Sequence, residues 1–76
     1  MNKRYIIRHI PTDKVYIEDE GGSWLVERDD AFISFGKEDE ANHFFDCVKD
    51  MADDNDGLLF TEDGEFPIEE FEVCEL

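Results

Sequence analysis

Residues 37–52 read KEDEANHFFDCVKDMA, and this stretch decides the fold class. Its apolar side chains recur at intervals of three and four residues, which is the periodicity of one helix face. They are Ala41, Phe44, Phe45, Val48 and Met51. Carboxylates fill the first turn, where the helix dipole favours negative charge, and Gly36 is the expected N-cap. The spacing predicts a helix over residues 37–52 with one apolar face.

The sequence also indicates how this helix ends and what it covers. The polar run at residues 53–57 closes with Gly57, which suits the left-handed conformation that follows many helices. We expect Phe44, Val48 and Trp24 to be buried between the helix and a sheet. Asp46 and Asp50 should face water, because they lie opposite the apolar stripe.

Three strands are predicted before the helix. Residues 5–10 are rich in β-forming side chains, and Pro11 and Asp13 favour a turn over residues 11–14. Residues 15–17 then return as the second strand of a hairpin. After a polar loop at residues 18–23, residues 24–26 form a third strand, and residues 31–33 either extend it or lead into the helix.

Two further strands are predicted after the helix. Residues 58–61 form one, and the Asp63-Gly64 pair is a hairpin signal. Pro67 excludes residues 66–68 from a central strand, because proline lacks the amide proton that the ladder needs. Residues 71–76 alternate and are expected at an edge. The order β-β-β-α-β-β predicts an α+β fold: a small antiparallel sheet of about four to five strands with one amphipathic helix packed on one face.

Length and composition indicate one folded domain over residues 1–76. The chain has 76 residues, of which 41% are hydrophobic and 13% aromatic, and this is too apolar for a disordered acidic tail. Two cysteines do not make a disulfide framework. The apolar stretch at residues 5–7 is interrupted by Arg8 and resembles neither a signal peptide nor a membrane span. We therefore expect a cytoplasmic protein, a monomer or homodimer.

The charge is distributed unevenly along the chain. The net charge is −15, from 22 acidic and seven basic residues. Residues 1–37 carry six basic and seven acidic side chains, whereas residues 38–76 carry fifteen acidic side chains and one basic one, Lys49. So negative a chain makes nucleic acid and anionic membranes poor direct partners, because phosphate binding depends on Lys and Arg. A basic protein is the expected partner.

Metal sites suggested by the sequence are incomplete. The run Asp54-x-Asp56-Gly57 is similar to part of a calcium-binding loop, but Ala52 stands where its first acidic ligand belongs. A zinc site would need His43 and Cys47 together with His9 and Cys74, from three separate elements and without the usual paired spacing. We expect no metal and no cofactor.

The sequence also lacks the patterns of common catalytic sites. It contains no glycine-rich phosphate loop and no Ser–His–Asp set, and a chain of this size has little volume for an enclosed pocket. A helix-borne Cys47 among carboxylates would have its thiolate disfavoured. The expected function is therefore non-enzymatic.

The acidic second half has two functional interpretations besides solubility. Asp39, Asp46, Asp50 and Asp53 fall along one side of the predicted helix, with a spacing compatible with nucleic-acid phosphates. The carboxylates could imitate a phosphate backbone, or they could serve a regulatory or adaptor domain that binds a basic partner without imitating DNA. The predicted partner-binding residues are Asp39, Asp46, Asp50, Asp53, Asp54, Asp56, Glu62, Asp63, Glu65, Glu69, Glu70 and Glu72.

In size, net charge and the acidic tracts at residues 38–56 and 62–75, the chain resembles the small acidic DNA-mimic inhibitors encoded by phages and mobile elements. Those proteins block restriction enzymes, CRISPR effectors, repair enzymes or nucleoid proteins. The resemblance implies an inhibitor that occupies a basic nucleic-acid-binding groove on another protein, in the cytoplasm of a host cell. It includes no motif that assigns individual binding residues.

Overall fold

The computed structural model describes residues 3–31 and 33–76, and these residues form an α+β fold, as expected. One α-helix of 16 residues is accompanied by six short strands and two 3-10 turns. In chain order the elements are β1 (Tyr5–His9), β2 (Lys14–Asp19), β3 (Gly22–Val26), η1 (Arg28–Asp30), α1 (Glu38–Asp53), β4 (Leu58–Thr61), β5 (Gly64–Pro67), η2 (Ile68–Glu70) and β6 (Phe71–Glu75). None of the helices formed by these residues has the length and hydrophobicity to cross a bilayer.

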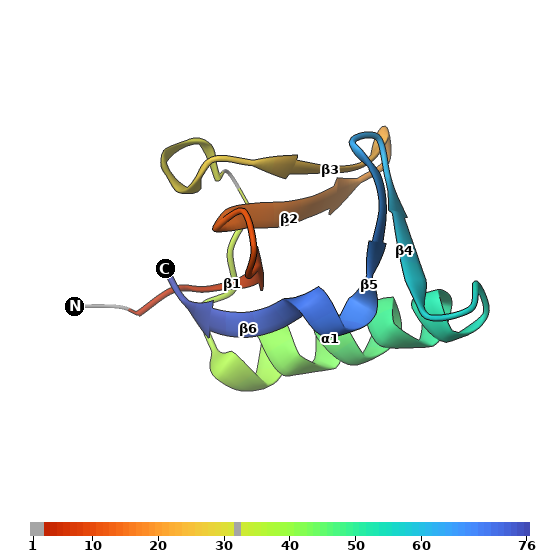
Figure 1. Ribbon diagram of the computed structural model, residues 1–76. Coiled ribbons are helices and arrows are strands. Elements are labelled where there is room, and N and C mark those ends of the chain that lie inside the picture. The colour runs from red at the N-terminus through yellow and green to blue at the C-terminus, as the bar shows by residue number, and fades with distance from the viewer. Residues whose placement is uncertain (1–2, 32) are drawn as a thin grey trace.

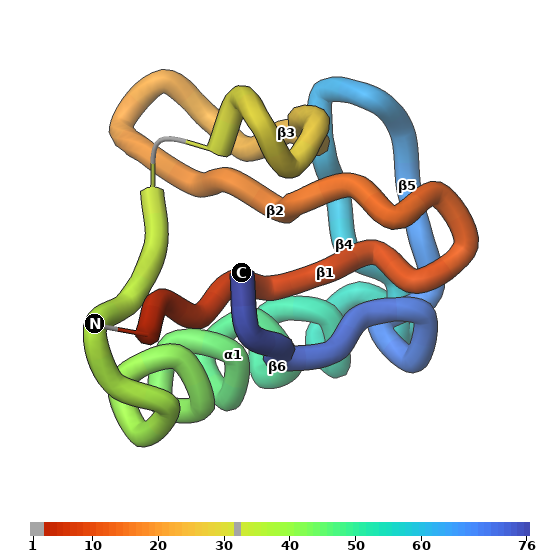
Figure 2. Tube along the Cα trace, turned by 90° about the vertical axis from the view of Figure 1, so that its left-hand side faces the viewer, coloured from red at the N-terminus to blue at the C-terminus, as the bar shows by residue number. Residues whose placement is uncertain are grey.

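Four of the strands form one antiparallel sheet in the order β3-β2-β1-β6. Strand β6 is at an edge, which confirms the prediction for the end of the chain. Strands β4 and β5 pair with each other in a separate hairpin. Figure 1 shows α1 packed along the side of the sheet that β1 and β6 form. The β4–β5 hairpin extends from the C-terminal end of α1 to β3. In Figure 2 the four strands of the sheet lie side by side, with α1 behind the lower two.

The strand register divides the core between the two faces of the sheet. Ile7 pairs with Tyr16, and Tyr16 pairs with Leu25, so all three side chains lie on the face that packs against Val48 of α1. The adjacent residues face the other way, because side chains alternate along a strand. That second face is a cluster of buried aliphatic residues, namely Ile6, Val15 and Ile17.

The prediction that Trp24 lies between the helix and the sheet is wrong. Trp24 pairs with Ile17 and packs in the cluster on the opposite face. A one-residue difference in register decides the face of a side chain, and the short run of residues 24–26 does not show which residues face the helix. The second face is covered by the segment after β3, from which Ala31 and Ile33 pack on it. The prediction for residues 31–33 also includes Phe32, which lies outside the described residues.

The helix follows its predicted range with small shifts. Val48 is fully buried, and Asp46 and Asp50 are exposed, as expected. Phe44 was expected to be buried but is only half-buried, although it packs against the core cluster that contains Val48. The N-cap is Lys37 and not Gly36, because Lys37 still has an extended backbone, with φ of −132° and ψ of 143°. Met51 is 47% exposed although it belongs to the apolar stripe. Gly57 has a φ of 79°, which confirms the left-handed position predicted for it.

The predicted hairpin after the helix is present, and Pro67 is outside the main sheet. Pro67 pairs with Leu58 at the open end of the two-stranded hairpin. Strand β5 has no second neighbouring strand, so the missing amide proton of proline removes no hydrogen bond on that side. The two residues of the turn are Glu62 and Asp63, flanked by the Thr61–Gly64 pair. The Thr61 hydroxyl closes the turn by donating to the Gly64 carbonyl oxygen at 2.9 Å.

The tip of this hairpin covers the outer edge of β3. The Glu62 amide donates to the Ser23 carbonyl at 2.8 Å, and the Leu25 amide donates to Oδ2 of Asp63 at 2.8 Å. The Ser23 hydroxyl donates to the Phe60 carbonyl at 3.0 Å. An open strand edge is a template for unwanted pairing, so these contacts protect β3 as well as anchor the hairpin.

Asp63→Ala should therefore loosen the edge of β3. The Leu25 amide loses a charged acceptor, and hydrogen bonds to charged groups contribute about 1.5–3 kcal/mol. We expect a cost of about 1–2 kcal/mol, at or below the lower end of that range, because water can replace the lost acceptor at this exposed site. Hydrogen exchange at the Leu25 amide should become faster. Glu65→Ala, which removes a carboxylate from the same hairpin, is the control, and equal effects from both would contradict this role of Asp63.

Candidate functional site

The outer face of α1 carries the predicted row of carboxylates. Asp39, Asp46, Asp50 and Asp53 are all exposed, while Ala41, Val48 and Ala52 on the opposite face are buried. With about 1.5 Å of rise per residue, Asp46, Asp50 and Asp53 follow one another at roughly 6 and 4.5 Å along the axis. The buried face holds α1 on the sheet, so the row is presented by a fixed element. We call Asp46, Asp50, Asp53 and the adjoining Asp54 the α1 carboxylate row.

Asp50, Asp53 and Asp54 lie at the wrong end of α1 for helix stability. A helix C-terminus has a partial negative charge that favours Lys or Arg, and each favourable side chain contributes about 0.3–1 kcal/mol. Within α1, whose residues are all described, the last turn has no basic side chain. Lys49 lies before it, 3.3 Å from Asp46 and 5.0 Å from the centre of the Phe45 ring. These three carboxylates therefore interact unfavourably with the helix dipole, and the carboxylates of the row repel one another. Lys49 is the one lysine of α1 that offsets this repulsion.

The basic side chains of the first half lie elsewhere and are largely engaged. On the sheet face away from α1, Arg8 donates to Asp13 at 2.6 Å and to Glu72 at 2.8 Å, and Arg28 donates to Asp13 at 3.3 Å. The hydrogen bond from Arg8 holds the pKa of the Asp13 carboxyl below its usual value, and the two carboxylates raise the pKa of Arg8. Arg4 is hydrogen-bonded to the hydroxyl and carbonyl of Ser34. These cations do not neutralise the α1 carboxylate row.

The remaining predicted carboxylates do not join this row. Asp54 and Asp56 are exposed at the end of α1, but Glu62, Asp63 and Glu65 belong to the hairpin, whose tip lies beside β3 and away from α1 (Figure 1). Within the described part of the chain, Asp63, Glu70 and Glu72 have internal partners: the Leu25 amide, His9 and Arg8. Glu69 is exposed in η2. The acidic surface is therefore divided between separate places, of which α1 carries the longest row.

The partner of Glu70 is a buried histidine. His9 is 2% exposed, with one ring nitrogen 2.7 Å from the Thr12 hydroxyl and the other 2.8 Å from the Glu70 carboxylate. Its ring packs against those of Phe66 and Phe71, at centroid distances of 4.7 and 4.8 Å. A buried polar ring with both nitrogens satisfied stabilises the junction of β1, the hairpin and β6. Glu70 therefore has a structural role, independent of any partner.

The candidate metal ligands are distributed over the molecule. His43 and Cys47 are exposed on α1, whereas His9 is enclosed and Cys74 lies 3.7 Å from the Arg28 guanidinium. Across residues 3–31 and 33–76, no three His, Cys, Asp or Glu side chains gather in a way that could hold a metal ion. The run at Asp54 and Asp56 forms the turn that ends α1, in which the Gly57 amide donates to the Ala52 carbonyl at 2.8 Å.

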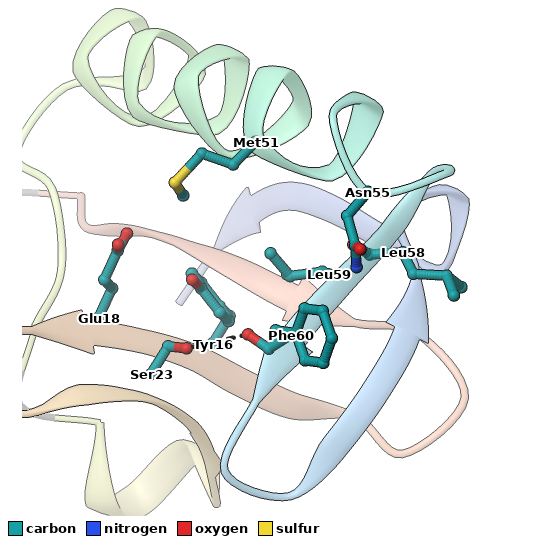
Figure 3. A pocket seen from close by; sticks show the side chains of 8 residues that line it. All are labelled: Tyr16, Glu18, Ser23, Met51, Asn55, Leu58, Leu59 and Phe60. Carbon is teal, nitrogen blue, oxygen red and sulfur yellow. Dashed lines mark hydrogen bonds between the residues drawn. The ribbon is translucent and has the colours of Figure 1, made fainter.

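A hollow of about 270 Å³ opens between β2, β3, β4 and the last turns of α1. It exists because α1 covers the β1–β6 side of the sheet and the hairpin reaches β3, so part of β2 between them stays uncovered. Figure 3 shows Tyr16 and Glu18 pointing from β2 toward α1, and Met51 reaching back from α1. The remaining lining residues are Ser23, Asn55, Leu58, Leu59 and Phe60.

The Tyr16 hydroxyl should lose its proton at a higher pH than an ordinary tyrosine, so a pH titration reports on the hollow. Burial raises the pKa of Tyr16, and the nearby Glu18 charge raises it further. Because the folded pKa exceeds the unfolded value of about 10, the stability that Tyr16 contributes is complete below that pH and is lost as pH rises through the folded pKa. Tyr16→Phe should remove a late step from the tyrosinate absorbance titration. A late step that persists in Tyr16→Phe and disappears in Tyr5→Phe would contradict this.

Sequence reasoning missed this hollow. The sequence places Met51 on the apolar stripe of the helix, and it does not indicate to which side Phe60 points from its strand. Alternation in β4 offers the one available signal: Leu59 is buried, so Phe60 must point outward.

Comparison of the chain with protein-family models, with curated proteins and with solved structures finds no match.

Proposed function

We propose that this protein is a non-enzymatic inhibitor that binds a basic, nucleic-acid-binding protein through the α1 carboxylate row. The observation that carries the proposal is the position of Asp50, Asp53 and Asp54. Their carboxylates are exposed at the helix end that disfavours negative charge, and no side chain of a described residue pairs with these carboxylates. A local arrangement that costs stability without a structural compensation is typical of a functional site.

The arrangement suits competition with nucleic acid. Phosphates along one DNA strand recur about every 3.4 Å of axis, so a rigid row of carboxylates at roughly 5 Å intervals can contact the same lysines and arginines. Its field attracts a basic groove over a distance set by the Debye length, about 8 Å at physiological ionic strength. Because α1 is packed against the sheet, the backbone that carries the row needs no folding on binding, which limits the entropy lost.

Affinity capture followed by competition tests the proposal. The immobilised protein is used to capture partners from a cell extract, and the captured protein is then challenged with double-stranded DNA and with RNA. We expect nucleic acid to release it, and we expect the capture to weaken steeply with added salt. A ternary complex of partner, nucleic acid and this protein would contradict occupation of the groove and would favour an adaptor that binds a basic partner without imitating DNA.

A further inference from the structure

The hollow beside α1 brings together two apolar side chains that water should disfavour. Met51 is 47% exposed and Phe60 is 58% exposed, and both line the hollow. The other two large apolar side chains exposed among the described residues, Ile10 and Leu76, do not line it. Single exposed apolar residues are ordinary on a protein surface, whereas neighbouring ones at a concave place indicate a binding surface.

The hollow contains one carboxylate that has no partner among the described residues. The Ser23 hydroxyl already donates to the Phe60 carbonyl, and the Asn55 amide donates to the Leu58 carbonyl at 3.2 Å. The Glu18 carboxylate has no hydrogen bond or ion pair with any described residue, although the residue itself is part of the β2–β3 ladder, and no basic residue lines the hollow. Glu62 adds negative charge nearby, since its side chain lies beside Gly22. The hollow therefore has apolar walls and an unpaired carboxylate, and it lacks a cation.

We infer that this hollow receives an arginine side chain of the basic partner. The methylene stem of arginine would pack against Met51, while its planar guanidinium would stack on the exposed Phe60 ring and pair with the Glu18 carboxylate. A volume of about 270 Å³ suits one long side chain better than a cofactor, because small-molecule pockets usually enclose about 300–1,000 Å³. The inference rests on the proposed function, because it requires a basic partner. It adds that one arginine of this partner inserts into the hollow.

Titration of the full-length protein with a short peptide tests the inference directly. The probe is the tripeptide Gly-Arg-Gly, acetylated and amidated at its ends, and the readouts are the NMR shifts of the Met51 methyl and the Phe60 amide. We expect saturable shifts confined to the lining residues. The same peptide with citrulline, the neutral analogue of arginine, should bind at least about tenfold more weakly. Glu18→Gln and Phe60→Ala should each weaken arginine binding by about tenfold.

The controls separate this site from general attraction to an acidic protein. Ile10→Ala and Leu76→Ala remove exposed apolar side chains elsewhere and should leave the shifts unchanged. Equal binding of the citrulline peptide would overturn the inference, because the hollow would then accept a neutral ligand. Shifts that spread along the α1 carboxylate row and survive both Glu18→Gln and Phe60→Ala would also overturn it, as would the absence of saturable shifts.

This titration uses no partner protein, so its outcome is independent of the capture experiment. A positive titration combined with failed nucleic-acid competition would keep the arginine site and reject the proposed inhibition. Successful competition combined with a negative titration would keep the acidic inhibitor and reject the anchor.

Discussion

Reversing the charge of Asp46, Asp50 and Asp53 to lysine should weaken binding of the captured partner at least about 100-fold, or roughly 3 kcal/mol. Each of the three carboxylates is exposed on one side of α1, so the change removes the centre of the α1 carboxylate row. The fold should tolerate it. Lysines at positions 50 and 53 complement the dipole, whereas the change at Asp46 removes its ion pair with Lys49, so we expect the free energy of unfolding to change by less than about 1 kcal/mol.

The matched control reverses Glu20, Asp29 and Asp30, which are exposed carboxylates outside α1 and the hairpin. Each reversal adds two charges, so both triple variants change the net charge of −15 by the same six charges. Asp13 is unsuitable for this control, because it accepts hydrogen bonds from Arg8 and Arg28. Equal losses from the two triple variants, measured by calorimetry at fixed salt, would show that bulk charge and not its placement determines binding.

Phe71→Ala should have the largest effect on stability, about 3–5 kcal/mol. Phe71 is 5% exposed, and its ring lies 4.8 Å from that of His9 and 6.0 Å from that of Tyr16, measured between ring centroids. Removing it leaves a cavity at the junction of both sheets with α1. A domain of this size has a total stability of about 4–11 kcal/mol, so the variant should melt at least about 15 °C lower and could be largely unfolded.

Phe60→Ala is the matched control for this prediction, because it removes the same side chain from a position that is 58% exposed. Its cost should be within about 1 kcal/mol. Phe44→Ala should fall between the two, since Phe44 is half-buried and contacts Phe35 at 5.3 Å between ring centroids. Urea unfolding of the three variants tests this order. A Phe71→Ala protein as stable as Phe60→Ala would mean that the core lies elsewhere.

Most of the secondary structure was predictable from the sequence, because the signals are local. The spacing of apolar residues over 37–52 predicts the helix, and the range of β4 is the one expected. The prediction that residues 66–68 form no central strand is confirmed, because Pro67 ends β5 in the two-stranded hairpin. The face of Trp24 was not predictable, since it depends on the register of β3 against β2, in which a shift of one residue exchanges the two faces.

The candidate site was predictable in part. The α1 carboxylate row follows from helix geometry alone. The fate of the other carboxylates does not, because their partners are distant in sequence: Glu70 bonds to His9, 61 residues away, and Asp63 bonds to Leu25, 38 residues away. Such pairs form only after the strands assemble, and no spacing in the sequence indicates them.

By itself, the sequence determined the helix, the strands other than β5, and the concentration of negative charge in the second half, since periodicity and charge are properties of neighbouring residues. The tertiary structure alone decided which carboxylates face water and which hold the fold together. It also created the hollow between Glu18, Met51 and Phe60, three residues from separate elements. Their proximity depends on how far α1 and the hairpin extend over the sheet, which is set by packing between segments distant in the chain.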